Sequence, residues 1–177
     1  MGYAVEMFFD EQTESKIRGY FKLLFDLGLS KTIYETGTRP HISLAVYNEV
    51  DLDKFTEKLK VFLKDKEPLK LGFVSISIFP TEPSTVFLTP NSSDELLRFH
   101  YDYHNFMDEF LKTEWGYYLP NNWVPHCAIA VEVPKQKAAD IIDEILKDFN
   151  QFHFYIEKIG IVEFRPVKEI KTFSLKS

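Results

Sequence analysis

The sequence is poor in cysteine, since Cys127 is the only one among 177 residues. A single thiol excludes an internal disulfide, and it disfavours a structural zinc site, because such sites draw most of their ligands from several cysteines. Proteins of the reducing cytosol usually have no disulfides. We therefore expect a cytoplasmic protein whose fold is held together by its core.

Long apolar runs and a basic N-terminal flank are also missing. No stretch approaches the roughly 20 apolar residues that a membrane-spanning helix needs. The N-terminal segment contains the carboxylates Glu6 and Asp10, which is not typical of a signal peptide, and Glu6 does not fit a myristoylation motif. These features predict a chain with neither a leader nor a membrane partner.

Positive charge is scarce. Lysine and arginine number 21 against 27 acidic residues, so the formal net charge is −6. The guanidinium groups that bind phosphates in a bidentate manner come only from Arg18, Arg39, Arg98 and Arg165. This balance disfavours a broad groove for a long nucleic acid.

Glycine-rich phosphate-binding motifs are absent as well. The seven glycines form neither a dinucleotide-binding fingerprint nor a P-loop, and there is no Gly-x-Ser-x-Gly elbow. An ATP-dependent ligase and an ordinary serine hydrolase are thus disfavoured. The sequence predicts no cofactor and no metal.

What the sequence does contain is ample apolar and aromatic material, with 45% apolar residues, 17 Phe and nine Tyr. Strand and helix patterns alternate without a linker, so we predict one α+β domain over residues 1–177. Strands are predicted at 3–9, 41–47, 69–79, 85–89, 123–133 and after 152. Helices are predicted after the N-cap residues Asp10 and Asp51, from Ser92 or Ser93 to about Lys112, and after Pro134.

A nine-residue segment occurs twice. Arg39-Pro-His-Ile-Ser-Leu-Ala-Val-Tyr47 aligns with Val124-Pro-His-Cys-Ala-Ile-Ala-Val-Glu132. Because side chains alternate along a strand, His41 shares a face with Ser43 and Ala45, and His126 shares one with Ala128 and Ala130. Small neighbours on that face leave space in front of each imidazole. The repeat therefore predicts two lobes that each place one histidine at a cleft.

Two facing imidazoles suit phosphodiester chemistry. One ring can accept the proton of an attacking hydroxyl or water while the other protonates the departing oxygen, and histidine does both near neutral pH. A hydroxyl such as that of Ser43 can donate to a non-bridging phosphate oxygen. A single Pro-His would be read as a structural histidine; the duplicated context favours the catalytic interpretation.

The duplicated motif resembles that of the 2H phosphoesterases, and within them the bacterial 2′-5′ RNA ligases. Their motif, His-x-Ser/Thr-x, is met by His41-Ile-Ser-Leu44 and incompletely by His126-Cys-Ala-Ile129. The segments Gly72–Phe79, Thr85–Pro90, Leu96–His100 and Tyr118–His126 are similar to the family's order of strand, strand, helix and loop before the second motif.

The resemblance implies a fold and a reaction. The fold is a two-lobed, pseudo-twofold arrangement of antiparallel sheets with flanking helices around a central groove. His41 and His126 would be the proton-transfer pair, and Ser43 would hold a phosphate oxygen. The substrate would be a small nucleotide or RNA terminus with a 2′,3′-cyclic or 2′-5′-linked phosphate. Ala128 departs from the motif, so one phosphate donor is missing, and a nucleotide- or RNA-end-binding protein with weakened turnover is the alternative.

Other candidate residues favour structural interpretations. His100 and His104 have a spacing that can bind metal, but the pattern places them at the edge of an apolar helix stripe. Cys127 points away from its neighbour His126 on a strand, so we predict a core residue. Three aromatic residues lie in the loop before the second motif: Tyr117, Tyr118 and Trp123. We predict that they anchor this loop, although their rings could also stack on a nucleobase. Arg39 stays unassigned, and His153 is predicted at the surface.

Overall fold

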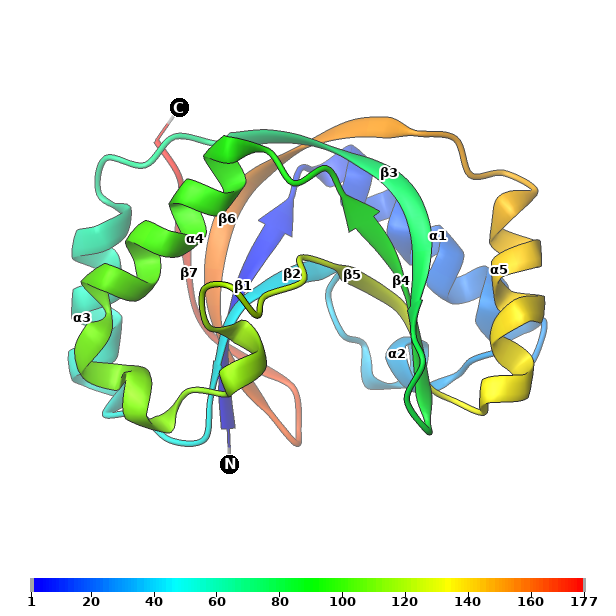
Figure 1. Cartoon of the computed structure of the whole chain (residues 1–177), viewed down its shortest axis with the longest axis horizontal. Coiled ribbons are helices and arrows are strands. Elements are labelled where there is room, and N and C mark those ends of the chain that lie inside the picture. The colour runs from blue at the N-terminus through cyan, green and yellow to red at the C-terminus, as the bar shows by residue number, and fades with distance from the viewer. Residues whose placement is uncertain (1, 177) are drawn as a thin grey trace.

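One antiparallel sheet runs through the whole structure, a computed structural model that describes residues 2–176 (Figure 1). The strand order is β2-β1-β6-β3-β4-β5, and β7 pairs with β6 outside this path. The strands are β1 (Gly2–Phe9), β2 (His41–Tyr47), β3 (Leu69–Phe79), β4 (Ser84–Pro90), β5 (Cys127–Val133), β6 (Phe152–Phe164) and β7 (Lys168–Ser174).

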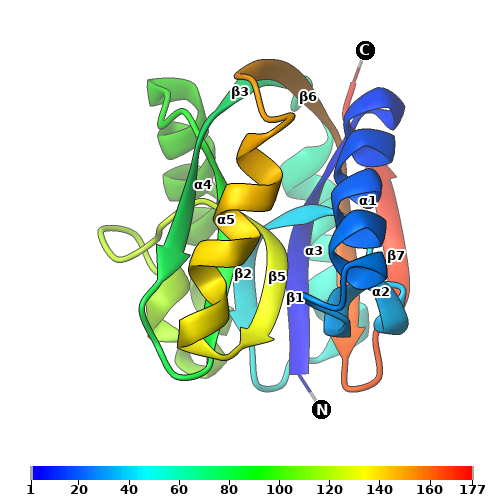
Figure 2. The same cartoon turned by 90° about the vertical axis from the view of Figure 1, so that its right-hand side faces the viewer.

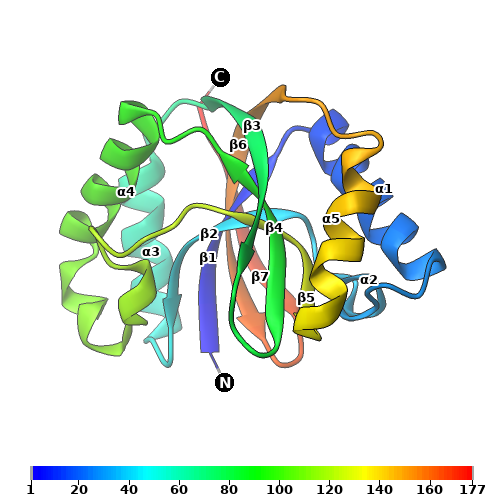
Figure 3. The same cartoon turned by 45° about the vertical axis from the view of Figure 1, so that its right-hand side comes forward.

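The longer helices lie in two pairs against the curved sheet. One pair is α1 (Glu11–Asp26) and α5 (Ala138–Leu146), and the other is α3 (Leu52–Leu63) and α4 (Asp94–Phe106), as Figures 1 and 3 show. Figure 2 views the first pair from its outer side. The short elements are α2 (Thr32–Thr36) and the 3₁₀ helices η1 (Asp108–Thr113), η2 (Gly116–Tyr118) and η3 (Lys135–Lys137). In the part of the chain from residue 2 to 176, no helix has the length and apolar character to cross a membrane.

The helices begin where side-chain caps allow. Asp10, Asp51 and Ser93 each accept a hydrogen bond from the backbone N–H three residues later, which satisfies a donor that the helix start leaves free. The apolar stripes of these helices face the core, and most of their predicted members are buried: Ile17, Tyr20, Phe21, Leu24, Phe55, Leu59, Phe62, Leu96, Phe99 and Tyr103. Phe106, which the same spacing predicts to be buried in α4, is 38% exposed. The α+β class with an antiparallel sheet and flanking helices is therefore confirmed.

Two predicted boundaries are wrong. The helix expected to reach Lys112 leaves α-helical geometry at Met107 and continues as η1. The strand expected from residue 123 begins at Cys127. Pro125 has no N–H to donate to a ladder, and the segment before it is a loop. The short helix α2 was not predicted at all.

The sheet has an internal symmetry that concerns β2 and β5, which lie at the two ends of the strand order and contact each other. Each has a bulge at the third residue after its histidine. Pairing shifts from Val5–Ala45 to Glu6–Ser43 in one half, and from Val86–Ala130 to Phe87–Ala128 in the other. Leu44 and Ile129 are thus the extra residues, and Glu6 and Phe87 occupy equivalent positions.

Candidate active site

The two copies of the motif line one cavity of about 740 Å³. His41 and Ser43 reach it from β2, and His126 and Ala128 reach it from the start of β5. The rest of the wall is mostly apolar and aromatic: Phe21, Ile33, Phe79, Trp115, Tyr117, Tyr118, Trp123, Val124, Val131 and Val167. The histidines, 85 residues apart in the sequence, thus share a hollow, as the repeat predicts.

Both imidazoles are held in the same way. The Nδ1 atom of His41 lies 2.7 Å from the carbonyl oxygen of Arg39, and that of His126 lies 2.7 Å from the carbonyl oxygen of Val124. A carbonyl only accepts, so each Nδ1 carries a hydrogen and donates. Each neutral ring therefore keeps the lone pair of Nε2 free, and this is the nitrogen that can exchange a proton with a substrate.

His126 has an apolar environment. The ring of Phe79 packs against it edge-on at 4.9 Å between centroids, and that of Phe87 lies at 5.2 Å. Burial lowers the pKa of His126, and the charge of His41 lowers it further, while the bond to Val124 opposes both. The ring is thus predominantly neutral at pH 7 and is suited to accept a proton.

His41 has a carboxylate beside it. Glu6 Oε1 lies 3.5 Å from His41 Nε2, and only 9% of the Glu6 side chain is exposed. Burial raises the pKa of Glu6 above its ordinary value; the charges of His41 and Arg39 offset this only in part, and that of Glu169 adds to it. The separation exceeds an ordinary hydrogen bond, so the Nε2 of His41 is not tied to Glu6.

Ser43 and Ala128 take equivalent places on the cavity wall, with a hydroxyl on one side only. The carbonyl of Ser43 accepts a hydrogen bond of 3.0 Å from Trp123 Nε1. This bond connects the loop before β5 to β2. The next small residues along each strand, Ala45 and Ala130, are fully buried and do not line the cavity. The prediction that small residues on the histidine face line the cavity is thus confirmed for Ser43 and Ala128. It is wrong for Ala45 and Ala130, because the bulge in each strand changes the alternation of side chains.

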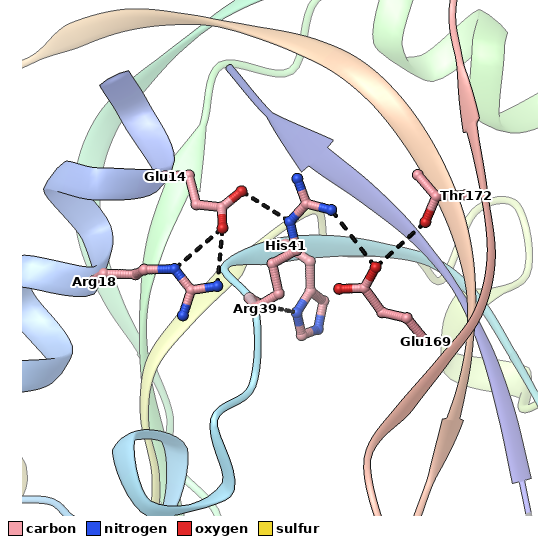
Figure 4. A network of polar contacts seen from close by, with 6 residues as sticks. All are labelled: Glu14, Arg18, Arg39, His41, Glu169 and Thr172. Carbon is pink, nitrogen blue, oxygen red and sulfur yellow. Dashed lines mark hydrogen bonds and ion pairs between the residues drawn. The ribbon is translucent and has the colours of Figure 1, made fainter. Parts of the chain in front are cut away.

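Arg39 is engaged by protein groups (Figure 4). Its Nε donates to Glu14 at 2.8 Å, and its Nη1 lies 3.8 Å from Glu169. The guanidinium also stacks on the ring of Phe8 at 4.0 Å. The other cation on the cavity wall is Arg165, for which no ion pair is found within residues 2–176.

His100 and His104 are buried, which corrects the prediction that they lie at the edge of the helix stripe. Each is 3% exposed. His100 Nε2 lies 2.8 Å from the carbonyl of Tyr118 and 2.9 Å from His104 Nε2, and His104 Nδ1 lies 3.2 Å from Glu114 Oε2. The sequence could not show this, because Glu114 reaches His104 from the loop after η1.

This buried cluster supports the cavity wall. The Tyr118 carbonyl only accepts, so His100 Nε2 carries a hydrogen, and this one hydrogen is shared between the carbonyl and His104 Nε2. His104 Nδ1 faces Glu114. Burial, followed by the charge of His104, lowers the pKa of His100 to about 3. The His100 ring stacks on Trp123 at 3.9 Å with 3° between the planes. A neutral ring thus backs the tryptophan that lines the cavity.

The remaining candidates lie where the sequence pattern predicts. Cys127 is fully buried, and burial raises the pKa of its thiol to about 12, so it is not a nucleophile at neutral pH. His153 is exposed. The residue that sequence reasoning missed is Glu6, whose available signal was a carboxylate in the middle of an otherwise apolar strand.

Comparisons with known proteins identify the family to which the chain belongs. By structure, the chain resembles TT0787 of Thermus thermophilus with a TM-score of 0.65 and 13% identity, covering 99% of this chain and 98% of the other. It also resembles E. coli LigT complexed with 3′-AMP, with a TM-score of 0.65 and 10% identity over 99% and 98% of the two chains. No curated protein sequence matches. The model of the 2′-5′ RNA ligase superfamily matches residues 31–167, and the chain therefore belongs to that superfamily, whose members are 2H phosphoesterases.

Proposed function

We propose that this protein is a phosphodiesterase or reversible 2′-5′ RNA ligase that acts without a metal through His41 and His126. One observation carries the proposal. Two imidazoles from distant parts of the chain are fixed by identical Nδ1 bonds of 2.7 Å and leave their Nε2 atoms free at one cavity. Superfamily membership supports a phosphoester as the substrate.

The arrangement can cleave a phosphodiester in one in-line displacement. One Nε2 accepts a proton from the attacking water as the new P–O bond forms. The other Nε2 gives a proton to the sugar oxygen as the old P–O bond breaks. The Ser43 hydroxyl donates to a non-bridging oxygen, where negative charge grows in the transition state. With the 5′-hydroxyl of a second RNA in place of water, the same displacement on a 2′,3′-cyclic phosphate forms a 2′-5′ bond and releases the 3′-hydroxyl, which joins two RNA ends.

A small nucleotide or an RNA terminus fits the cavity best. Its volume of about 740 Å³ lies within the range of small-molecule sites, and its aromatic wall offers faces on which a base can stack. Solved structures of LigT hold 3′-AMP, NADP⁺ and ATP. With a net charge of −6 and two arginines on the wall, a long RNA is the less favourable ligand.

The test is a panel of 2′,3′-cyclic nucleotides, 2′-5′ dinucleotides and RNAs with a cyclic phosphate end, assayed with and without EDTA. We expect release of a monophosphate or a cut 2′-5′ bond at the same rate in both conditions. Activity that EDTA abolishes would overturn the metal-independent mechanism. Tight binding to the panel without any product would favour the alternative, a binding protein that has lost turnover, which the missing hydroxyl at Ala128 motivates.

Substitution of Ala128 by Thr is expected to raise turnover. The change restores the second hydroxyl of the motif opposite Ser43, and a hydrogen bond to a charged group contributes about 1.5–3 kcal/mol, or roughly ten- to a hundredfold in rate. Ala128→Val, which adds similar bulk without a donor, is the matched control. Unchanged kcat in the threonine variant would mean that another group, of which Arg165 is the candidate cation on the wall, already stabilises that oxygen.

A further inference from the structure

The pseudo-twofold symmetry of the site is broken at one pair of equivalent positions. In each half, the residue opposite the second motif position comes from the neighbouring strand: Glu6 faces Ser43 across β1 and β2, and Phe87 faces Ala128 across β4 and β5. Directly opposed residues point to the same face of a sheet. Each of these side chains therefore lies beside the histidine of its own half, where one is a carboxylate and the other a phenyl ring.

Glu6 and Phe87 have opposite effects on a positive charge on the neighbouring histidine. Glu6 Oε1, at 3.5 Å from His41 Nε2, stabilises a positive charge on that ring. Phe87 and Phe79 pack against His126 and offer no acceptor, so a positive charge there is disfavoured. The backbone contacts are identical, at 2.7 Å to a carbonyl in each half, so they do not distinguish the rings.

We propose that Glu6 is a positioning residue that keeps a proton on His41 Nε2 and thereby sets the direction of proton transfer between the two histidines. This assignment rests on the proposed function. The proton starts on His41 Nε2 and ends on the alcohol as its P–O bond breaks. The water's proton ends on His126 Nε2, and the next cycle requires exchange of one proton with solvent. Glu6 itself neither gains nor loses a bond to the substrate.

The other charged and titratable groups around this pair do not replace Glu6. Arg39, in the segment before β2, is paired with Glu14. Glu169 on β7 lies 3.8 Å from Arg39, with its side chain 45% exposed. Tyr118 from η2 and the Cys127 thiol from β5 face Glu6, and burial raises the pKa of both, so they stay neutral at pH 7. His126, across the cavity, is the remaining titratable group near His41.

The experiment compares the wild type with Glu6→Gln, Glu6→Asp and Glu169→Gln. Hydrolysis of a 2′,3′-cyclic nucleotide is followed against pH. A proton donor is lost as pH rises, so in Glu6→Gln the alkaline limb of kcat/KM is expected to move to lower pH by about one unit or more, with the acid limb unmoved. Glu6→Asp keeps the charge and is expected to retain most of the wild-type limb. Glu169→Gln removes a charge that acts on Glu6 but lies away from His41 Nε2, and is expected to move the alkaline limb much less than Glu6→Gln does.

A second measurement does not depend on turnover. The ring protons of His41 and His126 are titrated by NMR in the wild type, assigned with the two single histidine variants. We expect His41 to hold its proton to higher pH than His126, and Glu6→Gln to narrow or reverse that order. The reverse order in the wild type, or an unmoved alkaline limb in a folded Glu6→Gln variant, would overturn the role of Glu6. Absence of hydrolysis in the wild type would instead refute the proposed function, and the NMR order would still decide on Glu6.

Discussion

Replacement of His41 or His126 by Ala is expected to lower kcat for a cyclic nucleotide by about a hundredfold or more. General acid and base catalysis each contribute factors of this size, and no other imidazole within residues 2–176 lines the cavity. The double variant is expected to lose little more than the worse single one, because the two rings act in the same displacement. KM is expected to change less than kcat, since the aromatic wall and Ser43 stay in place.

His153→Ala is the matched control for this experiment. His153 is exposed on β6 and does not line the cavity, so its removal is expected to leave kcat unchanged. Circular dichroism and the unfolding midpoint of all three variants separate a catalytic loss from a folding defect. Full activity in a folded His41→Ala or His126→Ala variant would refute the assignment of that residue.

Much of this site could be predicted because its signal is local. The strand at 41–47 was predicted with the bounds that β2 has, and the repeat of Pro-His within two alternating apolar segments predicted that two histidines meet at one cavity. Period-two and period-3.6 patterns fix which face of a strand or helix is buried. The positions of Ser43 and Ala128 follow directly from that alternation.

The parts that could not be predicted depend on pairing between distant segments. The bulges at Leu44 and Ile129 appear only when the register with β1 and β4 is known, and they decide that Glu6 and Phe87 stand beside the two histidines. The position of Glu114 likewise depends on the course of the loop after η1. Helical spacing placed His100 and His104 only at the edge of the apolar stripe, because it does not show the loop that covers them.

The buried cluster behind Trp123 is expected to matter for stability more than any exposed ion pair. In His104→Phe, the Glu114 carboxylate, whose side chain is fully buried, loses the imidazole that lies 3.2 Å away. Leaving a buried polar group without its nearest partner typically costs about 1–3 kcal/mol. We expect a loss of this size in the free energy of unfolding, measured with denaturant at pH 8.

The double variant His104→Phe, Glu114→Gln distinguishes this electrostatic cause from poor packing. It has the same phenyl ring at position 104 but an amide in place of the carboxyl group at position 114, so it is expected to be more stable than His104→Phe alone. Such recovery is the sign of coupling between the two positions. An equal loss in both variants would show that the ring of residue 104 matters for its shape, and that its contact with Glu114 does not contribute to stability.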